Sequence, residues 1–248
     1  EKNCMLKKLL LIVSVLALFF ASINGFSMDN SSGQVIKLPD PDYNGSVSVE
    51  EAMLNRRSVR EFEPEALTLQ QVSQILWAAY GVTKEMNSPS FLRGGFKTAP
   101  SAGALYPLEI YVVAGNVDGL PQGIYKYLPE GHQLMKTYDE DVRSDLAEAA
   151  INQDFIAQAP MSLVYSAVYS RTTGKYGKRG RERYVSMDLG HSAQNVCLQV
   201  VAMNLGTCPV GAFDDMMVRN VVMLPNDEEP LYIMPIGYPT GGGTLRER

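Results

Sequence analysis

The chain has 248 residues, of which 46% are hydrophobic and 20% are charged, and its formal net charge is −5. This composition is typical of a globular protein with a sizeable core, and the acidic balance argues against a general nucleic-acid binder, whose surface is basic. Three cysteines are too few for a disulfide scaffold. The two histidines, His132 and His191, stand too far apart in the sequence to suggest a metal site.

The first segment of the chain is predicted to be a targeting sequence. Lys7-Lys8 precedes an apolar run from Leu9 to Phe20 that is short for a membrane span, and small and polar residues follow. We expect residues 1–27 to be a signal peptide, with an uncleaved membrane anchor as the alternative. The protein would then be exported, as a periplasmic or secreted protein. Export would permit a disulfide between Cys197 and Cys208, but the apolar surroundings of Cys197 favour free thiols.

The next segment, residues 28–47, is rich in Ser, Asp, Pro and Gly, which predicts a linker or arm. One domain is expected over residues 48–248, because the sequence shows no repeat and no later boundary. Capping boxes at Ser48-x-x-Glu51 and Thr68-x-x-Gln71 predict the starts of the first two helices. Helices are predicted over residues 49–55, 68–81, 139–151, 184–205 and 214–223.

Strands and loops are predicted between these helices. Strands are expected at residues 109–113, 123–128, 132–136, 161–168 and 231–236. Residues 82–98 are expected to be an irregular loop, and the basic residues between 171 and 183 a solvated mobile loop. The helix over 184–205 is apolar nearly all round, which predicts that it is the buried centre of the fold. The absence of a regular βαβ rhythm indicates an α+β protein.

One basic stretch, Arg56-Arg57-Ser58-Val59-Arg60, suggests a specific ligand. It places three guanidinium groups and a hydroxyl within five residues, directly after a short helix. Arginine pairs with phosphate through two parallel hydrogen bonds and is always charged, so the stretch is a candidate anion site. The alternative is a solvated basic turn, because charge runs usually lie at the surface.

Three further motifs follow in order. The run from Pro100 to Pro107 consists mostly of small residues that let the backbone approach a flat ligand, Asp188 to Asn195 begins the long helix, and Leu205 to Phe213 contains a second group of small residues. Together with the arginine stretch, these motifs resemble the nitroreductase family of flavoenzymes. The resemblance covers residues 49–246 and is strongest to the branch whose members oxidise azolines in peptide biosynthesis.

The resemblance implies a nitroreductase-like α+β fold with a central mixed or antiparallel sheet flanked by helices, in an intertwined homodimer that binds FMN at its interface. The cofactor-binding residues that it implies are Arg56, Arg57, Ser58 and Arg60 at the phosphate, ribityl chain and pyrimidine edge; Pro100, Ser101, Ala102 and Gly103, from the other subunit, along the ring; Pro209, Val210, Gly211 and Ala212 beside the ring; and Arg246 at the phosphate.

These implications lead to an expected function. The protein would be an FMN-dependent oxidoreductase with a ping-pong mechanism, acting on a small-molecule or peptide substrate, with NAD(P)H or a quinone as the redox partner. The flavin performs the electron transfer, so no side chain is assigned as catalytic and no metal is expected. Lys175 and Tyr176 are local candidates for the lysine–tyrosine pair that handles protons in the azoline-oxidising branch.

Several alternatives remain open on the sequence. The domain could be an exported flavin- or ligand-binding module without turnover, or a flavin-free homodimer. His191 and Asp188 stand three residues apart and could form a proton relay, although a histidine packed against other helices is favoured. Ser58, His191 and Asp188 include the residue types of a hydrolase triad, but no G-x-S-x-G motif supports one.

Overall fold

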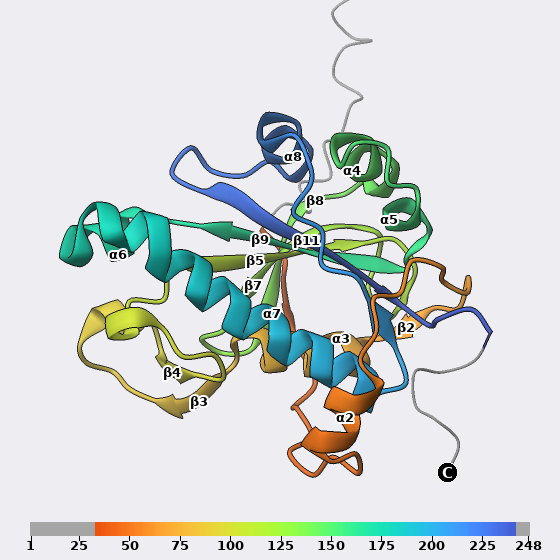
Figure 1. The fold of residues 1–248 in the computed structure, drawn as a ribbon, viewed down its shortest axis with the longest axis horizontal. Helices are drawn as coiled ribbons and strands as arrows, with labels where there is room; N and C mark the ends of the chain where they lie inside the picture. Colours follow the sequence, from red (N-terminus) through yellow and green to blue (C-terminus); the bar gives the residue numbers. More distant parts are fainter. Residues whose placement is uncertain (1–32, 242–248) are drawn as a thin grey trace, which may run out of the picture. The chain divides into compact units, whose positions relative to one another are not determined.

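The computed structural model describes residues 33–241, so the predicted signal peptide and Arg246 lie outside the described residues. A seven-stranded antiparallel sheet forms the centre, in the order β1-β8-β7-β5-β9-β11-β10 (Figure 1). Its strands are β1 (Val35–Lys37), β5 (Leu108–Ala114), β7 (Gly123–Leu128), β8 (Gln133–Tyr138), β9 (Met161–Ala167), β10 (Gly206–Thr207) and β11 (Glu229–Gly237). The expected α+β architecture, with a central antiparallel sheet flanked by helices, is confirmed in the described chain.

Helices cover both faces of this sheet (Figure 1). The helices are α2 (Val49–Asn55), α3 (Leu69–Tyr80), α4 (Arg143–Ala149), α5 (Phe155–Gln158), α6 (Ser170–Tyr176), α7 (Val185–Ala202) and α8 (Asp215–Val222). Helices α3 and α7 pack together in the larger apolar core, and α4, α5 and α8 enclose a second core on the opposite face. Two small sheets, β2 (Leu67–Thr68) with β6 (Val117–Asp118) and β3 (Val82–Glu85) with β4 (Gly95–Lys97), complete the fold.

The predicted caps begin the first two helices. Ser48 Oγ accepts a hydrogen bond of 3.1 Å from the backbone N–H of Glu51, which satisfies a donor that has no partner within the helix. Thr68 and Gln71 form a complete capping box at the start of α3. Gly81 follows the last residue of α3, and its N–H donates to the carbonyl of Trp77. Both helix starts were therefore predicted correctly from local hydrogen-bonding chemistry.

Helix α7 differs from the expected buried centre. One face packs into the core through residues such as Val196 and Val200, but Met187 is 50% exposed and His191 is also exposed. The expectation of a helix buried all round is corrected, because small and polar residues on the outer face interrupt the apolar surface. The preference for a packed His191 is wrong in this chain for the same reason.

The expected linker is also corrected. Residues 35–37 form edge strand β1, which pairs with β8, and Leu38 is buried. A chain of side chains fixes the next residues: Ser73 Oγ donates to the Pro39 carbonyl and lies 2.7 Å from His132 Nε2, and Tyr127 Oη lies 2.8 Å from His132 Nδ1. The segment from residue 33 onward thus belongs to the domain.

Two predicted loops contain regular structure. Residues 82–98 include the β3–β4 pair, and residues 171–183 include most of α6 and part of a π-helical turn, Gly180–Tyr184, that leads directly into α7. Charge pairing explains the second difference. Arg181 forms an ion pair with Glu229 and stacks 4.0 Å from the ring of Tyr169, so the basic segment is anchored to the sheet instead of being solvated throughout.

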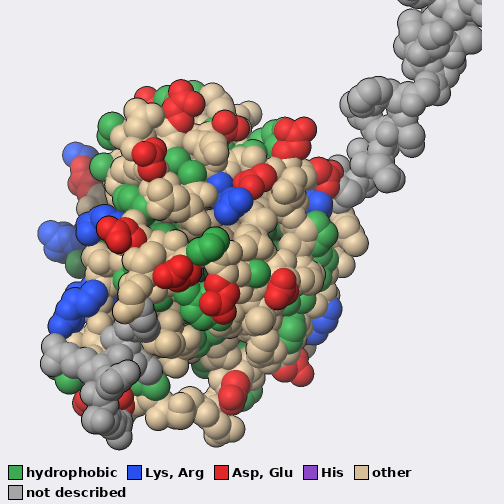
Figure 2. All heavy atoms as spheres, turned by 90° about the vertical axis from the view of Figure 1, so that its right-hand side faces the viewer, with side chains coloured by type: hydrophobic (Ala, Val, Ile, Leu, Met, Phe, Trp, Pro, Cys, Tyr) green, Lys and Arg blue, Asp and Glu red, His purple; other side chains and the backbone are tan. Residues whose placement is uncertain are grey.

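No helix in the described part of the chain is both long and apolar enough to span a bilayer. On the face shown in Figure 2, acidic side chains are scattered among apolar ones, and basic side chains gather mainly toward the left edge. Among the described residues, this face therefore offers no broad basic surface of the kind that binds nucleic-acid phosphates.

Candidate functional site

The arginine stretch leaves α2 and runs beside β10. The N–H of Arg56 ends the helix by donating to the Ala52 carbonyl, and Ser58 then forms a parallel bridge with Thr207. Gly206 permits this approach, because a Cβ at that position would lie 2.5 Å from the side chain of Val59. The missing side chain of one glycine thus allows the stretch to lie against the edge of the main sheet.

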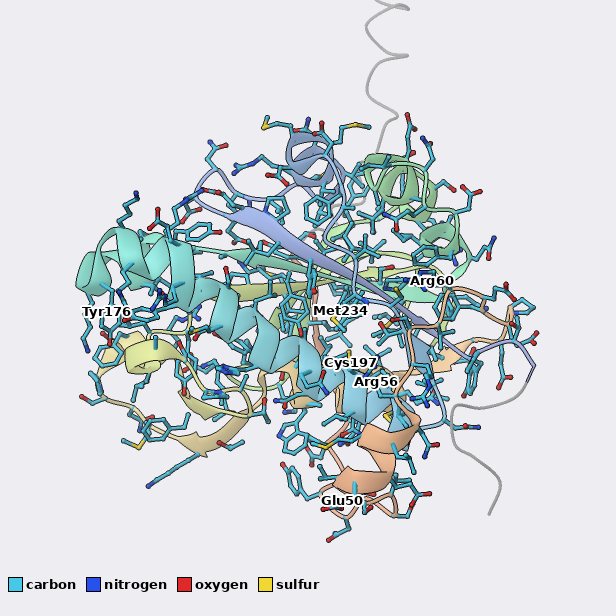
Figure 3. The ribbon with its side chains drawn as sticks, in the orientation of Figure 1. Glu50, Arg56, Arg60, Tyr176, Cys197 and Met234 are labelled. Atoms are coloured by element: carbon cyan, nitrogen blue, oxygen red, sulfur yellow. The ribbon has the colours of Figure 1, made fainter. Side chains whose placement is uncertain are left out.

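The three arginines have no carboxylate partner among the described residues. Arg57 donates to the backbone carbonyls of Leu54 and Arg56, at 3.0 and 2.8 Å, whereas the guanidiniums of Arg56 and Arg60 make no side-chain hydrogen bond there. Arg60 is exposed and Arg56 is half-buried beside Cys197 (Figure 3). Three neighbouring positive charges without an internal counter-charge are suited to binding an external anion.

Two buried oxygen atoms near the stretch also lack partners. Asn55 Oδ1, directly before Arg56, and Thr207 Oγ1, across from Ser58, form no hydrogen bond within the described residues. Buried polar atoms usually have partners, so these two oxygens have hydrogen-bonding capacity that the described chain does not use. The ribityl hydroxyls and phosphate of FMN supply donors and acceptors of this kind, and the residues present therefore fit that cofactor.

The segment Pro209–Ala212 lies at the same end of the fold as the arginines. It follows β10 directly, and Val210 exchanges backbone hydrogen bonds of 2.8 and 3.0 Å with Ile233 of β11. Gly211 and Ala212 are exposed, and the Ala212 carbonyl accepts from Gln153. The structure thus brings two of the predicted segments, 56–60 and 209–212, together along one sheet edge.

The small-residue turn is fixed to the other end of α7. Ser101 Oγ donates to Asp188 at 2.5 Å, and the N–H of Ala102 donates to the same carboxylate at 3.2 Å. Gly103 and Ala104 then adopt φ values of +64° and +56°, a left-handed conformation that glycine tolerates best. Pro100 and Gly103 are exposed, so part of the turn lies at the surface.

The proposed lysine–tyrosine pair lies against this turn. A Cβ added at Gly103 would lie 2.7 Å from Tyr176 Oη and 3.2 Å from Lys175 Nζ. Both side chains come from the last turn of α6, and Lys175 is exposed. The structure therefore places Lys175 and Tyr176 at the turn that was predicted to line the ring. The sequence alone had shown only that the two residues are adjacent in a basic segment.

The two ends of α7 are well separated. Arg60 and Tyr176 lie on opposite sides of the molecule, with Cys197 between them beside Arg56 (Figure 3). Asp188, which holds the turn, and Cys197, beside Arg56, are nine residues apart on α7, a rise of about 13 Å at 1.5 Å per residue. One chain therefore does not bring the arginines and the turn to a common point.

Other sequence hypotheses are resolved by the contacts. Asp188 binds Ser101 and Ala102, not Ser58, so the hydrolase triad is not assembled in this chain. Burial raises the pKa of Asp188, and its hydrogen bonds with Ser101 and Ala102 partly oppose that rise. Cys197 and Cys208 are free thiols, as favoured, and burial raises the pKa of Cys197 to about 11.

Sequence reasoning missed the anchoring role of Asp188. The signal was present, because a carboxylate at the buried face of an otherwise apolar helix needs hydrogen-bond donors. It also missed Glu109, a buried carboxylate that accepts from Arg93 at 2.7 Å and from Arg171 at 2.5 Å. No local pattern predicted that pairing, because its partners are distant in sequence.

Known proteins resemble this chain in sequence and in fold. A nitroreductase homologue of Methanocaldococcus jannaschii is 48% identical over 202 residues, 82% of this chain and 95% of that protein. The trifolitoxin operon protein TfxC of Rhizobium leguminosarum bv. trifolii is 25% identical over 201 residues, 75% of this chain and 54% of that protein.

A solved structure of a nitroreductase homologue from Ralstonia eutropha has a TM-score of 0.72 and 32% identity, and the match covers 85% of this chain and 91% of that one. The profile of the nitroreductase family matches residues 53–238. Sequence, fold and the arrangement of the motifs lead to one conclusion, that the chain belongs to the nitroreductase family.

Proposed function

We propose that the protein is an FMN-dependent oxidoreductase. The observation that carries this proposal is the group of arginines at residues 56–60, which has no counter-charge among the described residues and lies beside two unpartnered buried oxygens and the 209–212 segment. A phosphate-bearing cofactor would complete this group, and membership of the nitroreductase family favours FMN among such cofactors. FMN would supply the electron transfer, and the protein would supply position and electrostatics.

Each segment has a role in the proposal. Arg56 and Arg60 bind the phosphate and Ser58 the adjoining chain, because their side chains are unpaired in the described structure. Pro209 to Ala212 would lie beside the ring, with Gly211 and Ala212 as the exposed residues of the segment. Positive charge near the ring favours its reduced, anionic form. Arg57 is held by backbone carbonyls and would act mainly through its charge.

We further propose that the working unit is a homodimer. Because the arginines and the Pro100–Gly103 turn lie at opposite ends of α7, a cofactor held by the arginines of one copy would contact the turn of a second copy. The exposed outer face of α7, with Met187 and His191, offers surface that a second copy would cover. Each dimer would then contain two equivalent sites, as expected for a two-fold assembly.

The substrate would bind where Lys175 and Tyr176 meet the turn. These side chains hold exchangeable protons next to the ring-lining backbone, which suits proton transfer coupled to oxidation or reduction. The substrate would be a small molecule or a peptide, and the chain is 25% identical to a trifolitoxin operon protein. Two substrates would bind in turn at one surface, with NAD(P)H or a quinone as the redox partner. Export, suggested by the N-terminal apolar run, remains part of the proposal.

The first experiment is the visible spectrum of the purified chain, with the released cofactor identified by mass. We expect a yellow protein that releases FMN. The double variant Arg56→Ala with Arg60→Ala should lose the cofactor, with an expected rise in FMN Kd of at least about a hundredfold from two charge-assisted contacts. Lys84→Ala with Lys178→Ala is the matched control, because it removes two exposed positive charges elsewhere.

The outcomes separate the alternatives. Full FMN occupancy in the arginine double variant would overturn the assignment of the phosphate site. FMN binding without reduction by NAD(P)H or a quinol would instead favour a flavin-binding module without turnover. A colourless dimer that refuses added FMN would favour the flavin-free homodimer.

A further inference from the structure

A buried carboxylate on the central sheet connects the turn to α6. Glu109 is the second residue of β5, and only 8% of its surface is exposed. Its Oε1 accepts from Arg93 at 2.7 Å and Arg171 at 2.5 Å, and Lys126 Nζ lies 3.3 Å from its Oε2. Burial alone would raise the pKa of Glu109, but the charges of Lys126, Arg93 and Arg171 outweigh it and hold the pKa below its ordinary value.

The two arginines converge on a second atom. Arg93 Nη2 donates to the backbone carbonyl of Tyr106, and Arg171 Nη1 approaches the same oxygen at 3.3 Å. Glu109 thus holds both guanidiniums where they reach one carbonyl at the end of the small-residue turn. The Glu109 carboxylate therefore positions Arg93 and Arg171, and these two arginines hold the Tyr106 carbonyl.

That peptide group ends a turn that needs support. Tyr106 has φ of +47°, and Ala104 and Gly103 are also left-handed, at +56° and +64°. For residues other than glycine this conformation is unfavourable unless surrounding contacts enforce it. Asp188 holds the first end of the turn through Ser101, and Ser101 Oγ in turn accepts from the N–H of Tyr106 at 2.9 Å. The arginine pair holds the other end.

Arg171 also belongs to the first turn of α6, the helix that carries Lys175 and Tyr176. Its contact with Glu109 therefore sets where α6 begins relative to the sheet. The turn and α6 therefore contact each other at two places. Arg171, at the start of α6, reaches the Tyr106 carbonyl, and Lys175 and Tyr176, at the end of α6, lie against Gly103. Movement of Glu109 would be transmitted to both.

We propose that Glu109 is a positioning residue that, through Arg93 and Arg171, fixes the 101–106 turn and α6 relative to each other. The consequence of this positioning rests on the proposed function: the backbone of the turn and the Lys175–Tyr176 pair would be held in place for the cofactor and the substrate. The positioning itself concerns the chain alone. It can therefore be tested without bound FMN.

The experiment compares Glu109→Gln with Glu228→Gln in the full chain. Glu228 is a matched control, because it is also buried and pairs with Lys126 at 2.7 Å, but it bonds to Tyr111 and Ser166 and not to either arginine. Amide hydrogen exchange without FMN is measured first. In Glu109→Gln, residues 101–106 and 171–176 should exchange at least about tenfold faster than in the control, because their shared anchor has lost its charge.

The second readout uses the FMN-loaded protein. Glu109→Gln should still bind FMN, since the arginines of residues 56–60 are untouched, while kcat falls about tenfold to a hundredfold from misplaced groups. The visible spectrum of the bound flavin should also shift in Glu109→Gln and not in Glu228→Gln. A loss limited to stability would change neither the spectrum nor kcat at a temperature where both variants are folded.

Equal exchange at 101–106 in the two variants would overturn the proposal. If Glu109→Gln does not fold, Arg171→Gln serves instead, because it removes one arm and leaves the Arg93–Glu109 pair; faster exchange in α6 supports the proposal, and unchanged exchange overturns it. A wild-type chain that binds no FMN would remove the proposed function, while the exchange comparison would still decide the role of Glu109.

Discussion

The two ends of α7 carry charge in opposite ways. At the arginine end, the side chains of Arg56 and Arg60 have no carboxylate partner within the described residues. At the turn end, Asp188 and Glu109 are buried and bonded to groups of the same chain. The first region has charge left for a ligand, whereas the second uses its charge internally to hold a backbone shape. We infer that the arginine end would bind a ligand through its charge, whereas the turn end would contact it through the shape of its backbone.

The largest expected effect comes from breaking the turn end. Asp188→Ala removes the acceptor of Ser101 Oγ and of the Ala102 N–H, and we expect the free energy of unfolding to fall by about 2–3 kcal/mol, as for buried hydrogen bonds to a charged group. Chemical denaturation measures this loss. Asp188→Asn keeps one oxygen acceptor and should lose less; equal losses in the two variants would contradict the assigned anchor.

A smaller effect is expected from disturbing the arginine end by shape alone. In Gly206→Ala, the new Cβ meets the side chain of Val59 at 2.5 Å, and we expect a loss of about 1–3 kcal/mol from overpacking. FMN affinity should fall as well, because the arginine stretch moves from β10. The new Cβ also meets the Val59 Cβ at 2.7 Å, so the rescue needs Val59→Gly; the double variant Gly206→Ala with Val59→Gly should recover part of both losses. If it recovers neither, the close approach is not what Gly206 permits.

The smallest expected effect is on the pH dependence of stability, and it comes from His132, which lies at neither end of α7. Burial lowers the pKa of His132 below 6.5, and its neutral ring accepts from Tyr127 and donates to Ser73. The unfolded chain therefore binds the proton more readily, so this contribution to stability is present above pH 6.5 and is lost as the pH falls toward the folded pKa. Denaturation midpoints should decline over that window in wild type and less in His132→Asn.

His191→Asn provides the matched control for this pH series. His191 is exposed and bonds to no group in that network, so its variant should decline as wild type does. An identical slope in wild type and His132→Asn would exclude the buried ring as the cause. His132→Asn should leave the FMN affinity unchanged, because His132 lies at neither end of α7.

Local chemistry predicted much of the fold. The N-cap residues Ser48 and Thr68 identified two helices, since each side chain accepts a hydrogen bond from the backbone three residues further on. Strand β1 was missed because three residues at a sheet edge show no periodicity, and their pairing with β8 is remote in sequence. Helix α6 was missed because its basic residues suggest solvent, while Arg171 is in fact paired with Glu109.

The candidate site was predictable only in part. The arginine stretch stands out because its residues are consecutive and their chemistry suits phosphate. The role of Glu109 depends on Arg171. Arg171 contacts the Tyr106 carbonyl from 65 residues away in the sequence, so no local sequence pattern contains both residues. The placement of Lys175 and Tyr176 beside Gly103 likewise follows from the packing of α6. Consecutive charge is visible in a sequence, but convergence of distant charges is not.

The separation of the two ends along α7 has a genetic consequence. In the proposed dimer, a chain with a damaged arginine end and a chain with a damaged turn would together form one site with both defects and one site with none. Two inactive alleles of this gene would then complement each other when expressed in the same cell, with up to half of the sites in each mixed dimer intact. Two alleles damaged at the same end would not.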